Sequence, residues 1–249
     1  SPNGSKIVFE SGRDGNGNIY VMNADGTGQV RLTDNTDRDG EPQWTPDGNK
    51  IVFYSDRSGE AQIYIMDADG GNERPLSFAN LTEWGPSVMS DGRIIWQRSE
   101  YQDKGADYSH TLWAIRPDGT HADLVFGNDT LNCYASGNEV PGSDEILCTL
   151  VSHGGDLNGP LALIDPAKGR FNPVAITSIT PDVAPHYHMS WARERCFRDP
   201  FPIDRDYYLC SHAPADRFGL YVVDRWGNRE LLYLDPAIGS MSPAILRAS

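Results

Sequence analysis

Apolar residues in the first third of the chain fall in short runs that repeat at a fixed spacing. Turn-forming Pro, Asn, Asp and Gly residues bound each run, which is typical of β-strands joined by tight turns. The following segments recur 44 residues later: Ser1-Pro2-Asn3-Gly4 as Thr45-Pro46-Asp47-Gly48, Ile7-Val8-Phe9 as Ile51-Val52-Phe53, Ile19-Tyr20-Val21-Met22 as Ile63-Tyr64-Ile65-Met66, and Asp25-Gly26 as Asp69-Gly70. The pattern therefore predicts two copies of one strand-rich unit.

Two further segments complete this unit. Gln29-Val30-Arg31-Leu32 alternates polar and apolar residues, as expected for a half-exposed outer strand. Glu41-Pro42-Gln43-Trp44 precedes the first turn of the second copy and adds an inner strand. Four antiparallel strands in about 40–50 residues are typical of a β-propeller blade.

The same markers continue to the end of the chain, with third strands predicted to begin near residues 19, 63, 112, 161 and 220. We predict an all-β fold in which one β-propeller domain spans residues 1–249. Five four-stranded blades are predicted within these residues, and a sixth blade upstream of Ser1 is an alternative. The predicted blades cover about residues 1–33 plus 240–247, 41–78, 84–127, 132–176 and 186–234.

The first unit lacks an innermost strand, whereas residues 241–246 have no unit of their own. An open ring would leave unpaired strand edges. We therefore expect this C-terminal strand to pair with the first blade and close the ring.

Composition narrows the classes of partner. The 249 residues carry a formal net charge of −14, which disfavours nucleic acids and anionic membranes. No run of 18 apolar residues occurs, so no membrane span is predicted. Because the chain begins inside a repeat, we expect it to be cut from a longer polypeptide.

The four cysteines form no C-x-x-C or C-x-x-C-H motif, so the chain has no haem-attachment or zinc-ribbon motif. Cys196 and Cys210 flank a predicted turn near residue 203, and Cys133 and Cys148 flank another less symmetrically. The alternatives are disulfides within these pairs or four buried thiols. A disulfide would favour a periplasmic or extracellular location.

Blade geometry assigns the loops to two faces, because successive strands of a blade alternate in direction. The short Pro-Asp-Gly and Ala-Asp-Gly turns share one face. The long loops share the other, which we call the irregular-loop face: residues 13–18, 55–61, 99–109, 152–159 and 213–218, and the connections 34–41 and 179–185. Irregular loops on a rigid scaffold often carry function.

Candidate chemistry gathers on the irregular-loop face. Its histidines and aromatic residues are His110, His153, His186, His188, His212, Trp84, Tyr101, Tyr108 and Trp191. His186 and His188 form an H-x-H pair whose side chains would project from one side of an extended segment. Such a pair begins a transition-metal site, which His153 or His110 would complete.

Two resemblances rest on these motifs. The first two units, with Ser1-Pro2-Asn3-Gly4 and the segment Ile19-Tyr20-Val21-Met22-Asn23-Ala24-Asp25-Gly26-Thr27, resemble the TolB-type propeller repeat, which implies a six-bladed-like fold. From about residue 84, segments such as Trp84-Gly85-Pro86-Ser87-Val88 and Asp199-Pro200-Phe201-Pro202 resemble the propeller region of proteins related to the hydrazine synthase alpha subunit. In that enzyme c-type haems carry the redox chemistry. The second resemblance therefore implies haem-bearing domains or subunits as partners.

Three functions compete. In the first, the domain is an extracytoplasmic binding or scaffold module that holds a protein or glycan on the irregular-loop face. In the second, which rests on a local similarity to oligogalacturonate lyases, it is a metal-assisted uronate lyase. That reaction needs a base, a cation for the carboxylate and an acid, and the candidates are His153 as base, Arg193 or Arg217 for the carboxylate, and Tyr108 or Tyr187 as acid. In the third, the histidines are hydrogen-bonded loop residues of a spacer domain.

Two charge patterns remain. The acidic connection at residues 34–41 is either a Ca²⁺ loop or a solvated acidic loop. Arg13 and Arg57 recur with the repeat, and we expect both to pair with acidic loops between blades.

Overall fold

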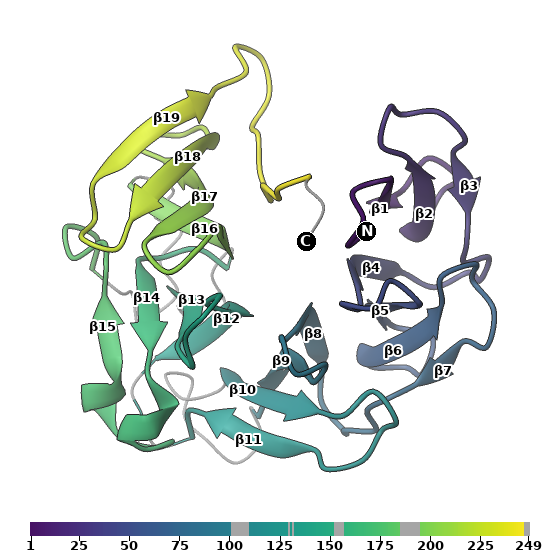
Figure 1. Cartoon of the computed structure of the whole chain (residues 1–249), viewed down its shortest axis with the longest axis horizontal. Helices are drawn as coiled ribbons and strands as arrows, with labels where there is room; N and C mark the ends of the chain where they lie inside the picture. The colour runs from purple at the N-terminus through teal and green to yellow at the C-terminus, as the bar shows by residue number, and fades with distance from the viewer. Residues whose placement is uncertain (101–109, 129, 131, 152–156, 185–194, 247–249) are drawn as a thin grey trace. The chain divides into compact units, whose positions relative to one another are not determined.

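The computed structural model of the chain describes residues 1–100, 110–128, 130, 132–151, 157–184 and 195–246. Its strands form five antiparallel sheets, each built from strands that are consecutive in the sequence (Figure 1). Four of these sheets have four strands, and the first, in the order β1-β2-β3, has three. The predicted all-β fold of propeller blades is confirmed.

The strands, grouped by sheet, are β1 (Lys6–Ser11), β2 (Asn18–Asn23) and β3 (Val30–Arg31); β4 (Asp39–Trp44), β5 (Lys50–Ser55), β6 (Gln62–Asp67) and β7 (Arg74–Pro75); β8 (Glu83–Val88), β9 (Ile94–Ser99), β10 (His110–Ile115) and β11 (Asp123–Phe126); β12 (Cys133–Glu139), β13 (Ile146–Val151), β14 (Leu161–Ile164) and β15 (Ile176–Ser178); β16 (Cys196–Pro202), β17 (Tyr207–Ala213), β18 (Gly219–Asp224) and β19 (Arg229–Tyr233). Two short 3-10 helices, η2 (Pro166–Lys168) and η3 (Pro173–Ala175), lie between β14 and β15.

The first two blades share one register. Phe9 lies opposite Tyr20 in the pair β1–β2, and Phe53 lies opposite Tyr64 in the pair β5–β6. The 44-residue sequence repeat is therefore also a repeat of strand pairing. Burial differs, because β5 has a strand on both sides, whereas β1 lies at the edge of its sheet and, among the described strands, pairs with β2 alone.

A β-bulge lies near the middle of the first strand of all four four-stranded sheets, in β4, β8, β12 and β16. The bulged residues have a left-handed backbone: Glu41 (φ 52°), Gly85 (φ 66°), Ser136 (φ 53°) and Asp199 (φ 49°). A bulge adds one residue and bends the strand locally. The sequence reasoning did not anticipate this feature.

The prediction that a C-terminal strand pairs with the first blade is wrong for the described residues. Residues 234–246 form no strand, although Ser242 has the same left-handed backbone (φ 56°) as the bulges of the innermost strands. The amide of Ser240 donates to the carbonyl of Phe218 at 2.8 Å, and the amide of Ser242 donates to Oγ of Ser211 at 2.9 Å. The segment is therefore held by hydrogen bonds to the last blade, and the first sheet keeps three strands.

The chain divides into two compact units, one mainly residues 1–98 and the other mainly residues 124–245. In the first unit, Ile19, Ile51, Phe53, Tyr64 and Met66 form a buried cluster. The second unit has a larger cluster that joins the fourth and fifth sheets: Val140, Leu147, Leu161, Leu163, Ile179, Val183, Phe197, Tyr208, Cys210 and Val223. Each cluster joins apolar side chains of neighbouring sheets, and their burial favours the packing of those sheets.

The cysteines are all buried as thiols. The suggested pair of Cys196 and Cys210 is not formed, because Cys196 lies opposite Ala213 and Cys210 lies beside the bulge of β16. Cys133 likewise lies opposite Val151 rather than Cys148. The pairing was predicted because Cys196 and Cys210 are equally far from residue 203. The turn between β16 and β17 is centred past residue 203, so the two cysteines are not opposite each other.

No helix within the described ranges is long and apolar enough to cross a membrane.

Candidate functional site

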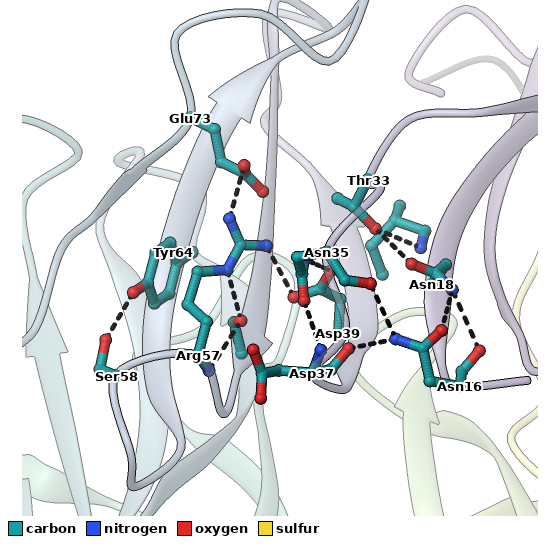
Figure 2. A network of polar contacts seen from close by, with 12 residues as sticks. Asn16, Asn18, Thr33, Asn35, Asp37, Asp39, Arg57, Ser58, Tyr64 and Glu73 are labelled. Carbon is teal, nitrogen blue, oxygen red and sulfur yellow. Dashed lines mark hydrogen bonds and ion pairs between the residues drawn. The ribbon is translucent and has the colours of Figure 1, made fainter.

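Three loops of the irregular-loop face meet in the first unit: the loops after β1 and β5, and the connection from β3 to β4 (Figure 2). The Nδ2 group of Asn16 donates to the carbonyls of Asn35 at 3.1 Å and Asp37 at 2.5 Å. The amide of Asp39 donates to the carbonyl of Gly17 at 2.8 Å. Side chains and backbone thus tie the loop of one blade to the connection into the next.

An ion pair lies at the centre of this network. Asp39 begins β4 and its side chain is fully buried, while Nη2 of Arg57 lies 2.8 Å from its Oδ1 atom. Arg57 also contacts Glu73 through Nη1 at 2.5 Å and donates from Nε to Oγ of Ser55 at 2.8 Å. Asn35 donates to the second oxygen of Asp39 at 2.6 Å. Both oxygens of the buried carboxylate therefore have partners.

The electrostatics of Arg57 follow from this setting. Burial opposes its positive charge, but hydrogen bonds to Glu73 and Asp39 outweigh burial and raise the pKa of Arg57 above its usual value. Its guanidinium also lies 4.9 Å from the ring centroid of Tyr64, where a cation–π contact adds to the fit. The arginine is held on several sides as a charged cross-link between loops.

The two repeated arginines differ in their partners. The expectation that Arg57 pairs with acidic residues is confirmed. The same expectation for Arg13 is wrong, because Arg13 donates to Oγ of Ser11 at 2.9 Å and to Oε1 of Gln29 at 2.5 Å. Gln29 stands 44 residues before Glu73, so the repeat itself shows that the first copy has a neutral residue where the second copy has an acidic one.

A second buried carboxylate was missed by sequence reasoning. Glu83 begins β8, its side chain is fully buried, and its Oε1 atom accepts from Nε of Arg98 at 2.5 Å and Nε1 of Trp96 at 3.0 Å. Glu83 lies 44 residues after Asp39, and this offset could have identified it. A buried carboxylate thus opens the innermost strand of both the second and the third blade.

Most exposed charged residues in the three loops around the Asp39–Arg57 pair are acidic. Their exposed charged residues are Arg13, Asp14, Asp34, Asp37, Arg38 and Glu60. Arg38 is paired with Glu10 at 3.0 Å. Within the described ranges, no group of three or more His, Cys, Asp or Glu side chains is placed to hold a metal ion. The Ca²⁺ interpretation of residues 34–41 gains no support from Asp39, whose carboxylate is bound to Arg57.

Two of the predicted histidines lie inside blades. His110 is buried on β10, and His212 is buried on β17. Nδ1 of His212 lies 2.9 Å from the carbonyl of Cys196, and its ring stacks on Phe197 with centroids 4.0 Å apart. Burial lowers the pKa of His212, an effect that the bond to the Cys196 carbonyl opposes. For His212 the structure agrees with a hydrogen-bonded interior role.

The other predicted site residues divide into two groups. Trp84 is half-buried on β8, and Arg217 donates from Nη1 to the carbonyl of Pro236, which ties its guanidinium to the chain after β19. The second group lies outside the described residues: Tyr101, Tyr108, His153, His186, Tyr187, His188, Trp191 and Arg193. The metal and lyase assignments of these residues stay predictions.

Comparisons with known proteins agree with the fold. The family described as the TolB beta propeller domain matches residues 1–111. Among solved structures, hydrazine synthase from Kuenenia stuttgartiensis is 17% identical with a TM-score of 0.77 and covers 98% of this chain and 39% of its own. TolB from Acinetobacter baumannii is 16% identical with a TM-score of 0.67, over 93% of this chain and 53% of its own.

A third similar structure is an oligogalacturonate lyase in complex with manganese, at 15% identity and a TM-score of 0.57, over 89% of this chain and 60% of its own. The chain thus spans between about two fifths and three fifths of the length of these proteins. No curated protein matches the sequence. At these identities the likeness concerns the fold, and the two resemblances that the sequence motifs indicated are confirmed at that level.

Proposed function

We propose that this propeller is a binding module and that the irregular-loop face is its interaction surface. The observation that carries the proposal is the network around Asp39 and Arg57, which fixes three loops before any partner arrives. Loops that are ordered in advance lose less conformational entropy on binding. Ordered loops therefore favour a binding role, because a spacer domain would not need its loops to be held in place.

The exposed groups on this surface favour a basic or hydrogen-bonding partner. Four of the six exposed charged residues are acidic: Asp14, Asp34, Asp37 and Glu60. The formal net charge of −14 adds a long-range attraction for cationic proteins. We therefore favour a protein with a basic surface over a glycan. On the resemblance to TolB-type propellers, we place the module outside the cytoplasm and within a larger protein or complex.

Affinity capture with matched surface variants tests this function. The loop variant replaces Asp34, Asp37 and Glu60 with lysine, and the control replaces the turn residues Asp25, Asp69 and Asp118 with lysine, which gives the same change in charge on the other face. Quantitative mass spectrometry compares proteins captured by each from the native host extract. A partner that the wild type and the control retain, and that the loop variant loses, supports the proposal. Equal loss in both variants, or no specific capture, contradicts it.

Lyase activity remains the second candidate, favoured by the likeness in fold to the manganese-bound oligogalacturonate lyase and by the predicted pair His186 and His188. Elemental analysis of the purified chain and of a His186→Ala variant would detect a bound transition metal. Ultraviolet absorbance would detect the unsaturated product formed from uronate oligosaccharides. Absence of both signals would remove this candidate. A role beside haem-bearing domains or subunits, implied by the likeness to hydrazine synthase, would instead show as captured protein with a haem spectrum.

A further inference from the structure

The first sheet has an open edge at β1. In the second blade β4 pairs with β5, and the side chains of Ile51, Val52 and Phe53 on β5 are fully buried. Among the described strands β1 pairs with β2 alone, and the equivalent side chains, 44 residues earlier on β1, are only half-buried. β1 has the same six-residue length as β5, and it contains no proline and no bulge. Because short length, proline and bulges usually protect a sheet edge, this edge can accept a further strand.

Arg13, in the loop after β1, is held in the same way as Arg57 in the loop after β5. Nε of each arginine donates to the serine two residues earlier, at 2.9 Å for Arg13 and 2.8 Å for Arg57. Nη1 of each lies 2.5 Å from the side chain that precedes the outer strand. Each guanidinium also lies over a tyrosine ring of the adjacent strand, at 4.7 Å and 4.9 Å from the ring centroid. Both arginines are therefore oriented before any further group binds.

The two arginines differ at Nη2. Nη2 of Arg57 donates at 2.8 Å to the buried carboxylate of Asp39, which is the first residue of the covering strand β4 (Figure 2). Within the described ranges, Nη2 of Arg13 has no acidic partner. Arg13 is thus oriented to bond a carboxylate that a strand covering β1 would present.

Two strands of the same unit show what such a strand contains. β4 begins with Asp39 and β8 with Glu83, and each carboxylate is buried and bonds an arginine of its own blade, at 2.8 Å and 2.5 Å. A proline stands three positions after each carboxylate, and the residue before that proline has a left-handed backbone: Glu41-Pro42 and Gly85-Pro86. The recurring pattern of a covering strand is therefore a carboxylate with a proline three positions later.

We propose that the open edge of β1 binds an extended segment of a partner protein that carries this pattern and serves as the innermost strand of the first blade. The carboxylate of the segment lies opposite Ser11, as Asp39 lies opposite Ser55, and accepts from Nη2 of Arg13. Main-chain hydrogen bonds to β1 supply affinity, and the carboxylate supplies specificity. The segment also buries the half-buried apolar side chains of β1 further, which favours binding.

Charge selects this segment at a single position. A carboxylate there meets a cation that is already oriented, whereas a neutral or basic residue would leave the covered guanidinium of Arg13 without an ion pair, which is costly. The net charge of −14 disfavours a partner that is acidic as a whole. One carboxylate in the segment is enough, so the same partner can carry the basic surface proposed for the irregular-loop face.

Segments of this chain itself fit the edge less well. In a second copy, β4 and β8 already pair with β5 and β9, so a blade would have to open to supply the pattern. The C-terminal segment has a proline, Pro243, but Ser240 stands in place of the carboxylate. The amides of Ser240 and Ser242 bond the last blade. A separate polypeptide is therefore the occupant that the structure favours.

A synthetic peptide with the sequence of residues 38–44 tests the proposal, since it copies the strand that covers β5. Calorimetric titration of the full chain should show binding, and Arg13→Gln should weaken it by about tenfold, corresponding to ~1.4 kcal/mol. Arg116→Gln, which removes an exposed arginine at a short turn, is the matched control and should bind as the wild type does. A peptide with Asp39→Asn should bind the wild type and Arg13→Gln equally, because the ion pair is absent in both cases.

Hydrogen exchange of the complex locates the peptide, because the outward-facing amides of β1 should gain protection and those of β5 should not. Protection of the β1 edge in the chain alone would point to the C-terminal segment as its cover. Protection that rises with protein concentration would point to a second copy. Either result would overturn the proposal.

The titration can overturn it as well. No binding up to about 1 mM peptide, equal binding of the two peptides to the wild type, or unchanged binding by Arg13→Gln would each do so. Thermal unfolding shows whether Arg13→Gln keeps the fold, which we expect because Arg13 is exposed. The peptide test does not involve Asp34, Asp37 or Glu60, so a negative result would leave the binding role of the irregular-loop face standing.

Discussion

The second and the last blade fix the polar groups inside them in different ways. In the second blade, charged Arg57 and Asp39 lie within 2.8 Å of each other, and the Asp39 side chain is fully buried. In the last blade, neutral His212 bonds the carbonyl of Cys196 and stacks on Phe197. One arrangement ties loops together with charge, and the other joins strands with an aromatic contact.

The outer edges of these two blades also differ. The second blade ends in the two-residue strand Arg74–Pro75, whereas the last ends in the five-residue apolar strand β19. The same four-stranded scaffold therefore combines a short, polar outer strand with an internal ion pair in the second blade. In the last blade it combines a longer, apolar outer strand with an uncharged histidine contact. We expect the second blade to depend on its ion pair for stability, and the last blade to depend on tight packing and on pH.

The largest effect should come from Arg57→Ala. This change leaves the buried carboxylate of Asp39 without its cation, and breaking a buried pair in this way costs about 3 kcal/mol or more. Arg13→Ala is the matched control in the first copy, where Arg13 is exposed and donates to the neutral side chains of Ser11 and Gln29. We expect that control to cost about 0.5 kcal/mol. Urea unfolding measures both, and equal costs would contradict the role given to the ion pair.

A smaller effect should separate two turn glycines with nearly the same backbone. Gly26 has φ 87° and open space around the position of a Cβ atom, whereas Gly227 has φ 88° and a Cβ there would collide with the carbonyl of Ile179. Gly26→Ala should cost about 1 kcal/mol from backbone strain alone. Gly227→Ala should cost about 1–2 kcal/mol more because of the collision. If urea unfolding gave the two variants the same stability, the last blade would not be as tightly packed at this turn as the structure indicates.

The pH dependence of the last blade should follow His212. Burial lowers the pKa of His212, the hydrogen bond to the Cys196 carbonyl opposes this, Arg229 lowers it further and Asp182 raises it. The folded pKa lies below the unfolded value of about 6.5, so the neutral form is favoured in the fold. Stability is then full above that unfolded value and is lost as pH falls through it toward the folded pKa.

Urea unfolding between about pH 7.5 and 5.5 measures this dependence. A His212→Gln variant should lose part of the decline in unfolding free energy seen for the wild type, since glutamine does not titrate. An Arg57→Lys variant is the control in the second blade and should keep the wild-type pH slope. Identical slopes for wild type and His212→Gln would rule out His212 as the source.

Local repetition made much of this fold predictable. The 44-residue spacing places Phe9 opposite Tyr20 and Phe53 opposite Tyr64, because strand pairing repeats wherever the turns repeat. The same spacing could have shown that Glu83 corresponds to Asp39. The loops around Asn16 and Asp39 were likewise assigned to one face from strand direction alone, and their hydrogen bonds agree.

The remainder depended on details that a linear pattern does not contain. Pro202 lies opposite Tyr208, so the turn between β16 and β17 is centred past residue 203 and Cys196 lies opposite Ala213 instead of Cys210. The linear pattern indicates that a turn is present but does not fix its centre to within one or two residues. The C-terminal segment was expected to form a strand, but the hydrogen bonds of its amides go to Phe218 and Ser211. The exposure of β19 appears only once the neighbours of each leucine are known.

The smallest effect should be seen in the thiols, which the structure leaves buried and unreactive. Burial raises the pKa of Cys210 to about 12 and also raises that of Cys148, so few thiolates exist at neutral pH to react with a thiol reagent. Without reductant, we expect almost no labelling of the native chain and four labelled thiols per chain after unfolding in urea. Two missing thiols after unfolding would show that one of the disulfides suggested by the sequence forms in solution, and the register between β16 and β17 would then need to shift to bring Cys196 to Cys210.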